Sequence, residues 1–508
     1  MPSSLPASQP SSLQAFKPSS EDRLVRWLFL RALGLVYLVA FVSLWVQVRG
    51  LIGAHGILPI GSFIEAARQF FDSHHVGLDR YRLLPTLSWL SPSDLALTTQ
   101  CAIGAVAAVF LVAGLAPGPC LVLLWTLYLS LVVAGQDFFS FQWDSLLLEA
   151  GLLAIVLAPW QWRPHLSKES PPSRVVVWLL RWLVFRLMFE SGSVKWLSGD
   201  PSWRHLTALT VHYQTQPLPT WIGWYAHQLP VWMQVASCAA MFGIEVGAPL
   251  LIFCGRRLRV VGGVLIIFLQ TLILLTGNYT FFNWLTIALC LFLFDDVALA
   301  RFVPKALRQQ LPTERQPVPS WRAHLAPAVL AAVVLPVSML SVLSMFQSPP
   351  NWLEPVAAMD NALEPLRSIN HYGLFAVMTT VRSEIVIEGS DDRVAWRPYE
   401  FADKPGDPMR RPSFVAPFQP RLDWQMWFAA LSTWRANPWF ANLCVRLLEG
   451  SPEVQRLLAG NPFPAQPPRY IRAMLYEYRF TNWAERRATG AWWIRTPAGE
   501  YFPEISLR

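Results

Sequence analysis

The chain has 508 residues, of which 53% are hydrophobic and only 15% are charged, and its formal net charge is +8. Soluble domains carry about 25% charged residues, so this composition excludes an ordinary soluble protein and indicates that lipid surrounds much of the chain. The sequence shows no basic face and no nucleic-acid motif, so we expect no nucleic-acid partner. The excess of Lys and Arg is typical of cytoplasmic loops in a membrane protein.

The first 22 residues are rich in Ser and Pro and are predicted to form a disordered tail. The apolar segment that follows begins too late for a signal peptide and has no small-residue cleavage site, so we expect it to remain as the first membrane helix. The six cysteines show neither a disulfide framework nor CxxC spacing. We therefore predict no metal site and no cofactor.

Apolar segments recur along residues 23–348, which are predicted to be a multi-pass transmembrane domain surrounded by membrane lipid. Spanning ~30 Å of hydrocarbon takes about 20 apolar residues per helix. By this measure the fold is a polytopic α-helical bundle of about nine spans, of which the third and eighth are short. The predicted spans are 25–48, 95–116, 119–135, 139–159, 174–197, 231–254, 258–276, 280–297 and 325–346.

Three clusters of Lys and Arg indicate the orientation of the bundle. In a nine-span model all three fall on the side of the N-terminus, which the positive-inside rule places in the cytoplasm. The segments 49–94 and 198–230, together with everything after Phe346, would then face outside. The clusters are Arg163, Lys168 and Arg174; Arg256, Arg257 and Arg259; and Arg301, Lys305, Arg308, Arg315 and Arg322.

Residues 349–508 are more polar and are predicted to form an extracytoplasmic α+β domain rich in strands. Residues 384–401 indicate two strands joined by a Gly-Ser-Asp-Asp turn, and residues 422–434 have the apolar spacing of a helix. Further strands are predicted at 470–480 and 491–507.

Asp144 and Glu149 are ionisable groups within an otherwise apolar span. An unpaired charge at mid-bilayer costs at least ~2.5–3.5 kcal/mol, so each carboxylate needs a partner. About 140° separates the two around a helix, so they face different neighbours. The fifth span offers candidate partners, and its Arg186 and Glu190 are spaced to pair with each other. The predicted polar clasp comprises Asp144, Glu149, Arg181, Arg186 and Glu190.

Two alternatives to a structural clasp stay open. The intramembrane charges can form a functional site for substrate or protons, or the spans are misplaced and the charges lie at the interface. Lys195 and Asp200, at the outer end of the fifth span, form either an ordered interfacial loop or a site on the outer surface. The chain contains no HExxH, GxSxG or Gly-rich phosphate motif.

Several long stretches resemble one family. They are FQWDSLLLEAG, SGSVKWLSGDPSWRHLTALTVHYQTQPLPT, NYTFFNWLTIALCLFLFDD, RPSFVAPFQPRLDWQMWFAAL and NPFPAQPPRYIRAMLYEYRFT. Together they identify the chain as a member of the lipase maturation factor family over nearly its whole length after about Arg23. The resemblance implies a membrane-anchored maturation factor that helps secreted homodimeric lipases, such as lipoprotein lipase, to reach their active fold. It also implies the endoplasmic reticulum membrane, or the cell membrane if the source is bacterial.

A second, weaker likeness concerns VKWLSGDPSW, which starts at Val194. This stretch is similar to a motif of the vitamin K-dependent γ-carboxylase and its bacterial relatives, which also join a helical membrane domain to a β-rich outer domain. The carboxylase carries paired lysines there, whereas Lys195 is followed by Trp196 in this chain. That departure argues against inherited carboxylase chemistry.

The sequence thus leaves two main hypotheses for function. The first is a non-enzymatic maturation factor whose outer domain shields client proteins with an exposed aromatic surface, although the same aromatic residues are also suited to the domain's own core. The second is an integral membrane enzyme that uses Lys195, Asp200, Asp144 and Glu149. A transporter is disfavoured because neither internal repeats nor paired broken helices occur. The client-binding candidates are Trp424, Trp427, Phe428, Trp434, Trp439 and Phe440.

Overall fold

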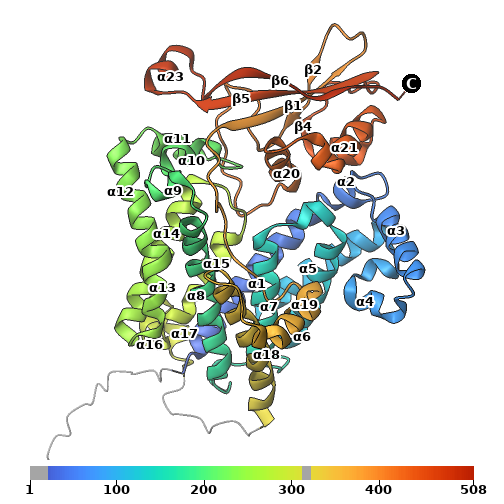
Figure 1. Cartoon of the computed structure of the whole chain (residues 1–508). Helices are drawn as coiled ribbons and strands as arrows, with labels where there is room; N and C mark the ends of the chain where they lie inside the picture. Colours follow the sequence, from blue (N-terminus) through green and yellow to red (C-terminus); the bar gives the residue numbers. More distant parts are fainter. Residues whose placement is uncertain (1–20, 312–321, 508) are drawn as a thin grey trace, which may run out of the picture.

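The computed structural model describes residues 21–311 and 322–507. A bundle of long helices carries a domain of strands and short helices at one end (Figure 1). The predicted tail lies outside the described residues except for its last two positions, and so does Arg315.

Helices occur at each of the nine segments predicted to cross the membrane. They are α1 (Arg23–Trp45), α5 (Asp94–Ala113), α6 (Pro117–Ala134), α7 (Gln142–Leu157), α8 (Arg174–Leu197), α12 (Val231–Phe242) with α13 (Ala248–Leu250), α14 (Arg256–Thr276), α15 (Phe282–Cys290) and α18 (Arg322–Ser344). A π-helical turn at Gly243–Gly247 joins α12 to α13.

Six helices in residues 21–311 and 322–507 are long and apolar enough to cross a membrane. They correspond to the first, second, third, sixth, seventh and ninth predicted spans. The third segment, which looked short in the sequence, meets the requirement as α6. Of the other three, α7 and α15 are shorter and α8 carries charged side chains along its length.

The connections at the sheet end of the bundle form short helices that touch the C-terminal domain. Arg49 Nη2 donates to Glu453 at 3.0 Å, and Trp224 Nε1 donates to Thr481 Oγ1 at 3.3 Å. The helices at this end are α2 (Val48–Ile52), α9 (Pro201–Arg204), α10 (Leu209–Thr215) and α11 (Trp221–His227). Two further helices, α3 (Ile60–Ser73) and α4 (Arg80–Leu83), lie along the side of the bundle (Figure 1).

The opposite end of the bundle gathers the basic loops. Leu24, Leu166, Ala300 and Leu311 form a small apolar cluster there, and Arg26 pairs with Glu169 at 2.5 Å. Two short helices, α16 (Asp296–Leu299) and α17 (Lys305–Arg308), lie at this end (Figure 1). The loops that carry the predicted cytoplasmic clusters therefore share the end that is remote from the sheet.

The C-terminal domain is built on an antiparallel sheet of order β2-β1-β5-β6. Ile385 and Ile387 on β1 are fully buried, and Phe440 and Tyr501 pack edge to face at 5.1 Å where α21 meets β6. The predicted strand–turn–strand, the helix after it and the two later strands are all present. The elements are β1 (Arg382–Ser390), β2 (Arg397–Pro398), β3 (Glu400–Phe401), α20 (Arg421–Ala430), α21 (Pro438–Leu448), α22 (Pro452–Gln455), β4 (Leu458–Gly460), β5 (Tyr470–Phe480), α23 (Trp483–Thr489) and β6 (Trp493–Ile505). Helix α19 (Glu354–Leu363), which falls in the segment predicted for this domain, lies beside the bundle instead (Figure 1).

Candidate functional site: the charged junction between the bundle and the C-terminal domain

Asp144 pairs with Arg421, the first residue of α20 in the C-terminal domain. The guanidinium donates to both carboxylate oxygens, at 2.8 and 2.9 Å, and both side chains are fully buried. Tyr128 of α6 donates its hydroxyl hydrogen to the same carboxylate. The sequence analysis predicted an arginine of the fifth span, residues 174–197, as the partner of Asp144. This prediction was wrong, because the cation comes from the C-terminal domain, 277 residues away in the sequence.

Arg421 is held in place by further contacts. Its backbone N–H donates to the side chain of Gln47 at 2.9 Å, and its Nη1 donates to the carbonyl of Phe138 at 2.7 Å. The guanidinium also lies 3.5 Å from the ring centroid of Phe139. The start of α20 is therefore locked into a socket that the membrane domain provides.

Glu149 binds a helix neighbour and the linker that precedes β1. It pairs with Arg186 of α8, one of the two arginines predicted for it, and both side chains are fully buried. It also accepts hydrogen bonds from the Asn370 backbone N–H at 3.1 Å and from the Tyr372 hydroxyl at 2.8 Å. Arg186 in turn donates to the Asn370 carbonyl at 2.9 Å.

The remaining members of the predicted clasp have other partners. Glu190 accepts a hydrogen bond from the Tyr372 backbone N–H at 2.9 Å and a weaker one from Ser341, rather than pairing with Arg186 within the helix. Arg181 donates to the Phe292 carbonyl at 2.8 Å and lies 3.9 Å from Asp22. Arg181 thus belongs to the opposite end of α8 and not to the clasp.

These contacts define what the junction can do chemically. Each buried carboxylate has a cation or several N–H and O–H donors, which is the condition under which a buried charge is tolerated. Removing one partner would leave an uncompensated charge, so the network specifies one docked arrangement of the two domains. In residues 21–311 and 322–507, no group of three or more His, Cys, Asp or Glu side chains is placed to hold a metal ion.

Lys195 and Asp200, the enzyme candidates, each have separate partners. Lys195 Nζ pairs with Glu245 at 2.7 Å, where Glu245 lies in the π-helical turn after α12. Burial raises the pKa of Asp200, but hydrogen bonds from the backbone N–H groups of Met378 at 2.6 Å and Ser202 at 2.7 Å outweigh it and lower that pKa overall. Neither group contacts Asp144 or Glu149, so the structure does not bring the four together as a catalytic set.

Most of the predicted client-binding aromatics are buried. Trp424, Trp427, Trp439 and Phe440 are between 0% and 6% exposed, so the prediction of an exposed aromatic surface was wrong for these four. The reason is that α20 and α21 are covered on two sides, by the sheet and by the end of the bundle. Phe428 is 42% exposed and Trp434 is partly exposed.

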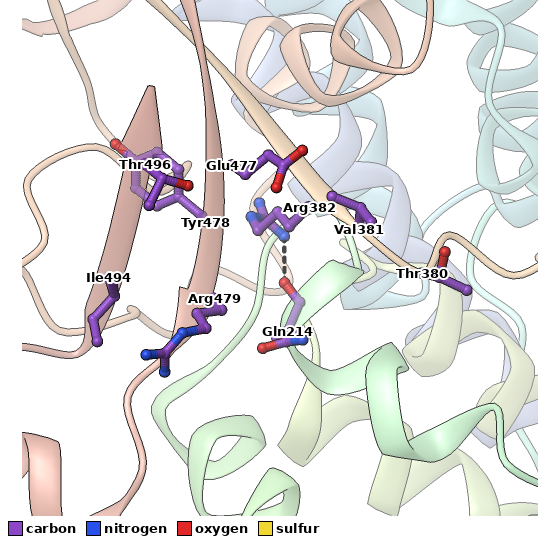
Figure 2. A pocket seen from close by; sticks show the side chains of 9 residues that line it. All are labelled: Gln214, Thr380, Val381, Arg382, Glu477, Tyr478, Arg479, Ile494 and Thr496. Atoms are coloured by element: carbon purple, nitrogen blue, oxygen red, sulfur yellow. Dashed lines mark hydrogen bonds between the residues drawn. The ribbon is translucent and has the colours of Figure 1, made fainter. Parts of the chain in front are cut away.

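A polar pocket of about 200 Å³ lies where the sheet meets α10 (Figure 2). Arg382 lines this pocket and donates to the Gln214 carbonyl at 2.9 Å, to the Pro217 carbonyl at 2.8 Å and to Glu384 at 2.6 Å. Glu384 also pairs with Lys404 at 2.8 Å. This is a second buried charge cluster that fastens the sheet to the membrane domain.

Two family models match the chain in succession. One, the lipase maturation factor transmembrane domain, matches residues 24–301, and the other, the lipase maturation factor C-terminal domain, matches residues 368–503. The chain belongs to the lipase maturation factor family. It is 38% identical to lipase maturation factor 1 of Mus musculus over 99% of this chain and 92% of that protein.

Other relatives agree with this assignment. The chain is 39% identical to lipase maturation factor 2 of Gallus gallus, with 95% of this chain and 81% of that protein covered. It is 36% identical to lipase maturation factor 1 of Homo sapiens, with 95% and 88% covered. No solved structure matches the chain.

Proposed function

We propose that this chain is a membrane-anchored maturation factor that assists the folding and assembly of secreted proteins, with homodimeric lipases as its clients. The observation that carries the proposal is the match of both domains, in order, to lipase maturation factors. The separate partners of Lys195 and Asp200 speak against the enzyme hypothesis.

The proposed topology has nine passes, with the N-terminus in the cytoplasm and the C-terminal domain outside. Its support is that the basic loops gather at one end of the bundle and the sheet at the other (Figure 1). By family the membrane is that of the endoplasmic reticulum, or the cell membrane if the source is bacterial. A phosphatase fused after Arg508 should be active outside the cytoplasm, and an active cytoplasm-only reporter at the same position would overturn the model.

The client surface is proposed to lie on the exposed side of α20. Phe428 on α20 is 42% exposed, Leu431 directly after the helix is 47% exposed, and the partly exposed Trp434 follows three residues later. Binding surfaces distribute their energy over a few aromatic and aliphatic anchors. The buried ion pairs of the junction would hold this surface in a fixed position beside the membrane.

The test is co-expression with a secreted homodimeric lipase, with active lipase measured per unit of correctly inserted protein. Phe428→Ala and Leu431→Ala should each weaken lipase binding, and the double change should weaken it further. A combined Lys195→Met and Glu245→Gln change removes both buried charges without stranding either, and it should preserve maturation. Loss of maturation in that variant, with normal insertion and client binding, would replace the proposal with a membrane enzyme.

A further inference from the structure

A cluster of exposed aromatic residues surrounds the joint between α11 and α23. Trp221 and Tyr225 of α11 lie 6.0 Å apart by ring centroids, and Tyr225 lies 5.6 Å from Trp483, the first residue of α23. Phe414 adds a third element, 5.9 Å from Trp221. Tyr225, Trp483 and Phe414 are each between 41% and 47% exposed, although they touch other aromatic rings.

The α11 part of this aromatic cluster directly precedes, along the chain, a helix that can span the membrane. Helix α12 begins at Val231, four residues after the end of α11. It is the first part of a continuous helix, Val231–Phe253, that is long and apolar enough to span the membrane. Its first residues, Val231 and Trp232, are 63% and 70% exposed, and they lie where a span that starts at α12 would meet the bilayer boundary. Trp and Tyr concentrate at that boundary because their rings are apolar and their N–H and O–H groups are polar.

Basic side chains flank the same aromatic cluster. Arg411 lies over the Trp221 ring at 5.7 Å, and Arg487 is exposed on α23. The acidic residue of α23, Glu485, is already paired with Arg479 at 2.6 Å, and that hydrogen bond lowers the pKa of Glu485 to about 2. The surface around the aromatic cluster therefore carries net positive charge at neutral pH.

We propose that the α11–α23 aromatic cluster is a lipid-binding surface through which the C-terminal domain rests on the adjacent leaflet, with Arg411 and Arg487 contacting anionic phosphate headgroups. The ring contacts from Trp221 through Tyr225 to Trp483 extend this surface from α11 to α23. The headgroup layer beyond the hydrocarbon is roughly 5–7 Å thick on each side. The centroid distances between neighbouring rings of the cluster, 6.0 and 5.6 Å, are of the same size, so the cluster is large enough to cross this layer. This role is separate from client binding and does not depend on the orientation of the bundle.

A depth-dependent quenching experiment tests this on the full chain in nanodiscs. Cys254 is the exposed cysteine and the other five are buried, so Cys254→Ser removes background labelling. An environment-sensitive dye is then placed at Ala484→Cys on α23, or at Val394→Cys, which is 83% exposed in the turn between β1 and β2 at the far side of the sheet. The probe is phosphatidylcholine with a doxyl group near the headgroup.

The expected result is several-fold stronger quenching at position 484 than at position 394, increasing when phosphatidylglycerol is added. Equal quenching at the two positions would overturn the proposal. Crosslinking of a secreted client to the label at 484, with no effect of the lipid quencher, would also overturn it and make the aromatic cluster a protein-docking surface.

The charge contribution has its own matched control. One arginine near an anionic surface changes binding about fivefold, so Arg411→Glu combined with Arg487→Glu should abolish the increase caused by phosphatidylglycerol. Arg397→Glu makes the same charge change on β2, at the opposite edge of the sheet, and should leave quenching at 484 unchanged. An equal loss with Arg397→Glu would show a general charge effect and contradict a lipid site at α11–α23.

Discussion

Asp144 and Glu149 lie five residues apart on α7, but they connect different parts of the molecule. Glu149 meets Arg186 on the next long helix, together with Asn370 and Tyr372 of the linker. Asp144 meets Arg421 at the start of α20. Both carboxylates are fully buried, so the energetic requirement is the same. One of them fixes the packing of helices and linker, and the other fixes where the C-terminal domain docks.

The largest expected effect comes from removing the cation of the domain junction. Arg421→Gln leaves Asp144 buried without a counter-charge, and breaking a buried pair in this way costs about 3–5 kcal/mol. We expect the variant to unfold at lower temperature in nanodiscs and to release the C-terminal domain to protease. Thermal unfolding and limited proteolysis measure the two effects.

A double variant separates charge from packing. Adding Asp144→Asn to Arg421→Gln removes the stranded charge. The double variant should therefore lose less folding stability than Arg421→Gln alone. If the double variant is no more stable than Arg421→Gln, the loss comes from packing around α20 and not from the ion pair.

A smaller effect is expected on the Glu149 side. Tyr372→Phe deletes one hydroxyl that donates to a buried carboxylate, and hydrogen bonds to charged groups are worth about 1.5–3 kcal/mol. Tyr279→Phe is the matched control, because its hydroxyl donates to the neutral side chain of Gln216 at 2.9 Å. Hydrogen exchange should increase in the linker around Asn370 in Tyr372→Phe alone. Equal exchange in both variants would argue that the charge of Glu149 does not hold the linker.

The sequence allowed one half of this network to be predicted. Glu149 and Arg186 lie on two consecutive apolar helices, and each needs a partner at the same depth. Their pairing can therefore be expected, because an unpaired buried charge is unfavourable and consecutive helices are usually neighbours. Arg421 instead begins a helix in a polar domain, where a charge at a helix end is usually exposed. The segment around Asn370 has no periodic pattern at all. The sequence around Arg421 and around Asn370 therefore does not show that these two residues contact the helices of the bundle.

The same reasoning explains the aromatic residues of α20 and α21. Their spacing predicted a helix correctly, but spacing cannot show how many sides of a helix are covered. Two layers, the sheet and the bundle, cover α20 and α21, so Trp424 and Trp439 became core. Exposed aromatics that touch one another, Tyr225 and Trp483, lie instead on α11 and α23, whose short sequences show no amphipathic pattern.

Asp403 is a partly buried carboxyl that, unlike Asp144 and Glu149, has no ion-pair partner in the part of the chain that the structure describes, so the stability of the protein should depend on pH through this group. Burial, reinforced by the nearby charge of Asp423, raises the pKa of Asp403 from 3.8 to about 6. The folded state therefore holds this proton more tightly than the unfolded state, and stability falls as pH rises from about 4 to about 6. Asp403→Asn should be more stable than the natural chain at pH 7 by about 1 kcal/mol, because water reaches part of this carboxyl. Melting temperatures across this pH range measure the difference, which should vanish below pH 4; a difference that persists there would have another cause.

The smallest effect is expected at an exposed pair that joins the same two domains. Arg49 contacts Asp94 at 3.4 Å and Glu453 at 3.0 Å, but its side chain is 46% exposed. Water screens such pairs, and they contribute about 0–1 kcal/mol. Arg49→Gln should therefore leave the C-terminal domain docked and protected from protease, and its small cost should disappear at high salt. Because Arg49 and Arg421 both bridge the bundle and the C-terminal domain, the two substitutions differ mainly in access to water. A cost for Arg49→Gln as large as that of Arg421→Gln would mean that burial is not what makes the Asp144 pair decisive.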